Sequence, residues 1–123
     1  MLKVPVSVGE VLDKISILEI KSERITDSVK LTNVTKELEC LKLATQNYRV
    51  PELEEELKNV NQQLWDVEDS LRLLEEQKDF GSNFINLARS VYALNDQRAS
   101  IKKQINLATN SALIEEKSYA HTA

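Results

Sequence analysis

The chain has 123 residues, of which 41% are hydrophobic and 29% charged, and it contains only 2 Gly and 2 Pro. So few turn-forming residues cannot serve the many turns of a β-sandwich or barrel, so the composition excludes an all-β fold. Sixteen Lys and Arg stand against twenty Asp and Glu, which gives a net charge of -4. This charge repels phosphate backbones and argues against a nucleic-acid partner.

Cysteine usage and hydropathy define the expected compartment. Cys40 is the single cysteine, which excludes a disulfide within the chain and fits a reducing environment. The first residues lack the apolar stretch of a signal peptide, and no segment approaches the ~20 apolar residues of a membrane span. We therefore expect a cytoplasmic protein without a membrane partner.

Two amphipathic helices are predicted in the first part of the chain. The sequence Ser-Val-Gly-Glu at residues 7–10 is a capping box, which predicts a helix over residues 7–26. Its apolar positions recur at three- and four-residue steps and span more than one stripe, so this helix is expected to touch two neighbours. Asp27 then caps a second predicted helix over residues 28–47.

The next two helices are predicted to form a long antiparallel hairpin. Pro51 suits a first helical position, and residues 51–78 carry a heptad seam of apolar residues. A turn follows, in which Gly81 is the expected C-cap, and residues 82–109 continue as the second arm. The first arm places its seam at Leu53, Leu57, Val60, Leu64, Val67, Leu71 and Leu74, and the second at Phe84, Leu87, Val91, Leu94, Ile101 and Ile105.

The sequence therefore predicts an all-α fold, resembling a four-helix bundle, in a single helical domain with a C-terminal tail over residues 110–123. Each hairpin arm is about 40 Å long at 1.5 Å per residue, which exceeds what the shorter first two helices can cover. The uncovered part of the hairpin favours self-association as a homodimer, or binding of another protein.

One polar residue interrupts the hairpin seam. Arg98 occupies a core position and needs an acceptor, for which Glu68 or Asp69 on the facing arm is predicted. The same region of the hairpin carries Trp65, Asp66, Arg72, Arg89, Tyr92, Asn95 and Asp96. Two interpretations stay open: a structural polar layer that fixes helix register, or a ligand pocket between the helices.

The acidic residues in this region raise the question of a metal. Asp66, Glu68, Asp69 and Asp96 could form a Mg²⁺ site, as in helical nucleotide pyrophosphohydrolases. The nearby arginines can instead neutralise these carboxylates as salt bridges, so we predict no metal and no cofactor.

A second set of charged residues lies on the first helix. Lys14, Lys21 and Arg24 share one face and could gather a small anionic ligand. Ordinary surface pairing of these cations with Glu10 and Asp27 is the alternative.

Four segments carry a resemblance to a known family. They are VSVGEVLDKISILEIKSERITD (6–27), LWDVEDSLR (64–72), FINLARSVYALNDQRASIKKQIN (84–106) and ALIEEKSY (112–119). Together they resemble a domain-of-unknown-function family of bacterial and phage proteins. The resemblance implies a whole-domain unit and transfers no activity. The ordered charges of the last segment suggest a docked tail, in which Glu115 or Glu116 pairs with Lys21 or Arg24.

We expect a non-enzymatic interaction or assembly module, because wide apolar faces and long arms account for more residues than any catalytic constellation does. The alternative is an enzyme that binds a small molecule or nucleotide in a charged mid-hairpin pocket, with or without Mg²⁺. The candidate binding residues are Lys14, Lys21, Arg24, Trp65, Glu68, Asp69, Arg89, Tyr92, Asn95, Asp96, Arg98, Lys117 and Tyr119.

Overall fold

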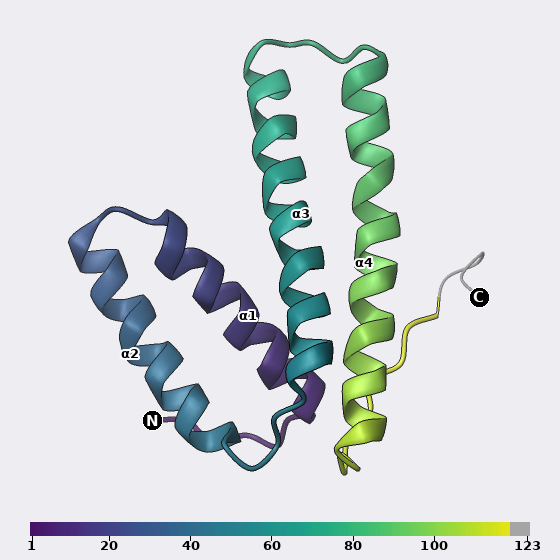
Figure 1. The fold of residues 1–123 in the computed structure, drawn as a ribbon. Coiled ribbons are helices and arrows are strands. Elements are labelled where there is room, and N and C mark those ends of the chain that lie inside the picture. The colour runs from purple at the N-terminus through teal and green to yellow at the C-terminus, as the bar shows by residue number, and fades with distance from the viewer. Residues whose placement is uncertain (119–123) are drawn as a thin grey trace.

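The computed structural model describes residues 1–118 and consists of four α-helices (Figure 1). The helices are α1 (Val8–Arg24), α2 (Ser28–Thr45), α3 (Pro51–Glu76) and α4 (Ser82–Ala108), and no strand occurs within residues 1–118. The predicted all-α class and the long α3–α4 hairpin are confirmed. None of these helices combines the length and apolar character that crossing a membrane requires.

Helix α1 lies at the centre of the arrangement. It packs against α2, α3 and α4, whereas α2 packs within the described residues against α1 alone. The sequence predicted two neighbours for α1, and the structure adds a third. The fold is therefore a core of α1, α3 and α4, with α2 laid on its outer side (Figure 1).

The helix ends differ from the predicted bounds by one or two residues. Helix α1 ends at Arg24 because Ile25 takes an extended conformation with φ -80° and ψ 133°. Helix α3 ends at Glu76, and the left-handed residue after it is Lys78 with φ 54°. Gly81 has φ -74° and is the N-cap of α4, so its predicted role as the C-cap of α3 is wrong.

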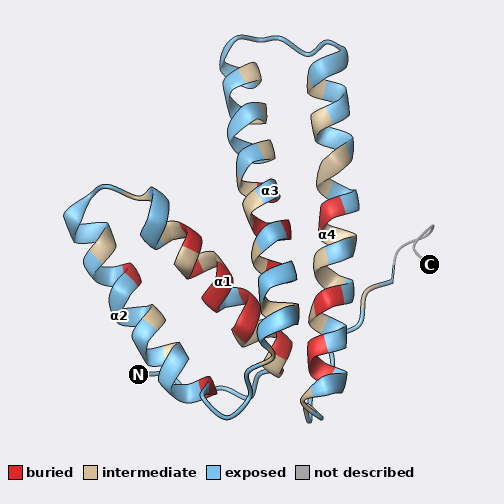
Figure 2. Ribbon diagram, viewed as in Figure 1, coloured by how far each residue is buried: buried red, intermediate tan, exposed pale blue. Residues whose placement is uncertain are grey.

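The buried core occupies only the proximal part of the hairpin. Along the seam, full burial reaches Leu64 on α3 and begins at Leu94 on α4. Figure 2 shows most of the buried residues on α1 and on the halves of α3 and α4 beside it; Val34 and Thr45 of α2 are also buried. Beyond this core, the seam continues as half-buried residues only: Val67, Leu71, Leu74, Phe84, Leu87 and Val91. We call residues 67–91 the distal arm.

Candidate functional site

A buried carboxylate lies where α1, α3 and α4 meet. Asp13 of α1 is 1% exposed. Its Oδ1 accepts hydrogen bonds from Arg98 Nε and from Asn61 Nδ2, each at 2.9 Å. Its Oδ2 accepts a hydrogen bond from Arg98 Nη2. The hydrogen bonds to Asp13 hold the pKa of Arg98 above its usual value. The predicted acceptor was Glu68 or Asp69, and this prediction is wrong.

The polar centre around Asp13 is closed by further hydrogen bonds. Asn61 Nδ2 also donates to Ser16 Oγ at 2.7 Å, and Ser16 Oγ donates to the backbone oxygen of Asp13 at 2.7 Å. Among the described residues, no buried side-chain nitrogen or oxygen lacks a partner. A paired centre of this kind fixes how the three helices meet.

The N-terminus of α1 is held by residues of α4 and the tail. Ser7 Oγ accepts from Glu10 N at 3.1 Å, and Asn106 Oδ1 accepts from Gly9 N at 2.7 Å. A Cβ on Gly9 would lie 2.5 Å from the backbone oxygen of Lys102, so only glycine permits this approach of α1 to α4. The first N–H groups of α1 thus have protein acceptors, as helix starts require.

The described part of the C-terminal tail follows α4. Ser7 Oγ donates to Glu115 at 3.0 Å, and Lys103 Nζ donates to Glu116 at 3.1 Å. Lys117 pairs with Asp96 on α4. The prediction that Glu115 or Glu116 pairs with Lys21 or Arg24 is therefore wrong, because the acids of the tail meet the lysines of α4 instead. Tyr119 lies outside the described residues.

A groove of about 360 Å³ separates the tail from α4. Its lining includes Asn95, Arg98, Lys102 and Lys117. Lys102 donates to Glu10 at 2.6 Å, and this hydrogen bond is the main reason why the pKa of Glu10 is lowered. The cations of the groove are thus bonded to protein carboxylates.

The predicted cations of α1 point to different neighbours. Arg24 pairs with Asp66 of α3, and its guanidinium carbon lies 5.7 Å from the ring centroid of Trp65. Lys14 Nζ lies 3.7 Å from Glu37 Oε1 of α2. Lys14 therefore contacts α2 and Arg24 contacts α3, so these two cations do not bind one anion together.

The surface pairs first considered for these cations do not form. Glu10 bonds Lys102 instead of Lys14, and Asp27 accepts from Lys30 N at 2.9 Å as the N-cap of α2. The side chain of Lys21 is half-buried near the end of α1.

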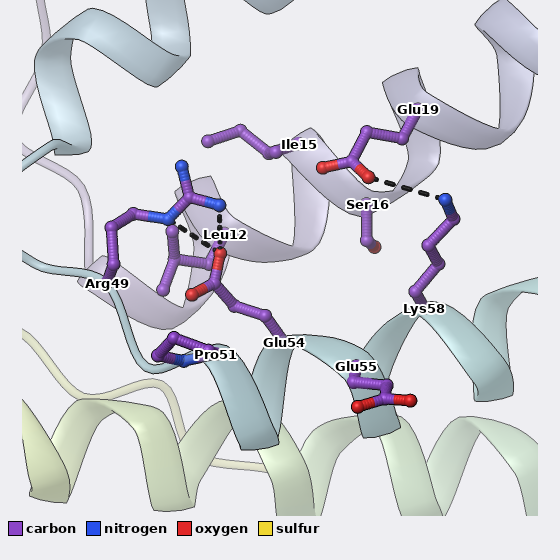
Figure 3. Close-up of a pocket in the computed structure, with 9 residues that line it drawn as sticks. All are labelled: Leu12, Ile15, Ser16, Glu19, Arg49, Pro51, Glu54, Glu55 and Lys58. Carbon is purple, nitrogen blue, oxygen red and sulfur yellow. Dashed lines mark hydrogen bonds and ion pairs between the residues drawn. The ribbon is translucent and has the colours of Figure 1, made fainter.

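A second pocket lies between α1, the loop after α2 and the start of α3. It has a volume of about 460 Å³, an apolar floor that includes Leu12 and Ile15, and a charged rim. Figure 3 shows Arg49 bonded to Glu54 at one end of the rim and Glu19 bonded to Lys58 at the other. None of its residues was predicted as a binding residue, because they come from α1, the loop after α2 and the start of α3.

The remaining candidate residues lie on the hairpin surface. Glu68, Asp69 and Arg89 are exposed, and Tyr92 is 62% exposed. The predicted mid-hairpin residues thus do not form one pocket. Arg98 contacts α1, Asp96 contacts the tail, and the residues farther along the hairpin face solvent. Within residues 1–118, no group of three His, Cys, Asp or Glu side chains is placed to hold a metal ion.

The fold and these contacts define an all-α protein built from two helical hairpins that a buried polar centre joins through α1. The chain belongs to the family of unknown function DUF6165, which matches residues 2–123. The resemblance to a domain-of-unknown-function family is thereby confirmed. No curated protein and no solved structure matches the chain.

Proposed function

We propose that the chain is a protein-interaction module that self-associates through the distal arm. The observation that carries this proposal is the change in burial along the hairpin. Leu57 and Ile105 of the proximal seam are 0% exposed, whereas every seam residue from 67 to 91 is only half-buried. The two helices of the distal arm leave their apolar seam partly exposed, and exposed apolar surface is typical of interaction sites.

Helix α1 explains the difference between the two halves of the hairpin. In the proximal half, α1 lies over the seam and supplies Leu12 and Ile15 to the core. In Figure 1 the distal arm extends beyond both α1 and α2. The distal arm therefore lacks the third helical layer that completes the proximal core, and an added helical surface would supply it.

The charged contacts of the molecule support this reading. Arg98, Lys102 and Lys58 are each bonded to carboxylates of the same chain. Intramolecular pairing of this kind holds helices together. The distal arm instead carries exposed apolar residues, among them Leu73, Phe80 and Ile85.

Removal of the distal arm tests the proposal. A variant that lacks one heptad from each arm, residues 68–74 and 84–90, keeps the seam register and the contacts of α1 with Asn61, Asp66 and Arg98. We expect wild-type protein to exceed 14.0 kDa in sedimentation equilibrium as concentration rises, and the shortened variant to stay at its monomer mass. A wild-type chain that stays monomeric up to ~1 mM, or a shortened variant that associates equally, would refute the proposal.

A further inference from the structure

The face of α4 that lines the tail groove carries cations and amides but no acid. Its residues in the groove of about 360 Å³ are Asn95, Arg98, Ala99, Lys102, Lys103 and Asn106. They recur at three- and four-residue steps and therefore share one face of the helix. Of the described lining residues, only Glu115 and Glu116 are acidic, and both belong to the tail. The α4 wall is thus a row of hydrogen-bond donors in a chain whose net charge is -4.

Arg98 keeps one edge of its guanidinium for the groove. Asp13 engages Arg98 through Nε and Nη2, so the carboxylate occupies one edge of the planar group. No hydrogen bond within residues 1–118 involves Arg98 Nη1. The Arg98 side chain is 30% exposed and lines the groove. Asp13 therefore fixes the orientation of the guanidinium, and the Nη1 group remains as a charged donor beside the groove.

Asn106 supplies a second donor from the same wall. It is 1% exposed, and its Oδ1 accepts a hydrogen bond from Gly9 N at 2.7 Å. No hydrogen bond within residues 1–118 involves its Nδ2. Because no fully enclosed side-chain nitrogen among the described residues lacks a partner, Asn106 Nδ2 reaches the open space of the groove that this residue lines. An amide nitrogen in such a buried place requires an acceptor.

The tail already presents carboxylates to this wall. Both carboxylate oxygens of Glu116 lie 3.1 Å from Lys103 Nζ, and Glu115 Oε2 lies 3.5 Å from Lys102 Nζ. The side chains of Glu115 and Glu116 are 53% and 70% exposed. Ion pairs that exposed to water contribute little free energy, so another anion can replace them. The contacts of the tail therefore indicate which ligand chemistry the wall accepts.

We propose that the groove between α4 and the tail binds a small organic dianion, whose two ends are carboxylate or phosphate groups. One end accepts from Arg98 Nη1 and the other from Asn106 Nδ2. Lys102 lies between them and exchanges Glu115 for the ligand. Positions 98 and 106 are about 12 Å apart along the helix at 1.5 Å per residue, so their side chains converge on the two ends of a short ligand. The volume of the groove is typical of a small-molecule site.

An NMR titration tests the proposal, because the side-chain amide of Asn106 has a signal of its own. The probes are glutarate with two carboxylates, phosphoglycolate with one carboxylate and one phosphate, and butyrate as the monoanion, all at constant ionic strength. We expect the Asn106 side-chain signal and the backbone amides of residues 98–106 to shift with a Kd on the order of 1 mM for at least one dianion. Butyrate should bind at least ~10-fold more weakly. The tighter of the two dianions identifies the preferred end group.

Three matched substitutions separate the groove from a general effect of charge. Asn106→Asp keeps the Oδ1 acceptor for Gly9 and replaces the Nδ2 donor with a second acceptor, so dianion binding should weaken at least ~10-fold. Asn59→Asp makes the same change at an exposed residue of α3 and should alter binding less than ~2-fold. Glu115→Gln keeps an acceptor for Ser7 and removes the competing charge, so binding should tighten about 3-fold.

Circular dichroism verifies that each variant is folded, and Glu115→Gln provides the test if Asn106→Asp does not fold. Absence of any shift with both dianions up to ~20 mM would overturn the proposal. Equal binding by wild type and folded Asn106→Asp would overturn it as well, as would a Glu115→Gln variant that binds no tighter than wild type. The groove lies outside the distal arm, so none of these results depends on self-association.

Discussion

The buried pair of Asp13 and Arg98 allows a quantitative test of how the three central helices are held together. Asp13 is 1% exposed and the Arg98 side chain is 30% exposed, so the two substitutions should differ in cost. Arg98→Met leaves a buried carboxylate without its cationic partner and should lower the free energy of unfolding by about 3–5 kcal/mol. Asp13→Asn leaves a guanidinium that water still reaches, and should cost about 2 kcal/mol.

The double variant Asp13→Asn with Arg98→Met completes a thermodynamic cycle. Because neither substitution then strands a buried charge, its cost should be smaller than the sum of the single costs by at least ~2 kcal/mol. Urea denaturation followed by circular dichroism measures all four proteins, with unchanged m values as the check on two-state behaviour. Single costs that add within ~0.5 kcal/mol would show that the pair does not couple α1 to α4, and the reasoning would fail.

Three further predictions address other contacts. Gly9→Ala should lower the free energy of unfolding by about 2–3 kcal/mol, because the new Cβ would lie 2.5 Å from the backbone oxygen of Lys102; a variant as stable as wild type in thermal denaturation would contradict the close packing of α1 on α4. Lys78→Gly should raise stability by about 1 kcal/mol, since Lys78 has φ 54°, and a fall in melting temperature would count against that conformation. Lys102 lowers the pKa of Glu10, so this contact stabilises the fold above the ordinary glutamate pKa and is lost as pH falls through the lowered value; NMR titration should show the pKa of Glu10 rising in Lys102→Met.

The helices and the seam could be predicted because their signals are local. The capping serine Ser7, the N-terminal Pro51 of α3 and the heptad spacing from Leu53 to Leu74 each act within a few residues of the chain. Such signals also define which face of each helix is apolar. The gradual loss of burial along this seam could not be read from the heptads, because it depends on where α1 ends in space.

The partner of Arg98 could not be predicted from the pairing of the two hairpin arms, because it lies outside the hairpin. Asp13 belongs to α1, and its contact with Arg98 spans 85 residues of sequence. A signal was present: Gly9, Asp13 and Ser16 follow one another at helical spacing among the apolar residues of α1, and all three are buried. A polar residue inside an otherwise apolar face requires a partner from another helix.

The helix on which the tail docks could not be predicted from the sequence either. The charges of the tail suggested docking, but composition did not distinguish the cations of α1 from those of α4. Ser111 determines that the tail lies along α4. Its backbone N–H donates a hydrogen bond to Asn106 O at 2.8 Å and directs the following residues back along α4. The left-handed Asn110 before it, with φ 53°, makes this reversal at the end of the helix.

Hydrogen exchange of the backbone amides at two protein concentrations tests the central claim most directly. If the distal arm is the assembly surface, amides of residues 67–91 should exchange more slowly at ~500 µM than at ~5 µM, because a weak dimer forms only at the higher concentration. Amides of α2, which lies away from the distal arm, should exchange at the same rate in both samples (Figure 1). Equal exchange of residues 67–91 at both concentrations would contradict the account.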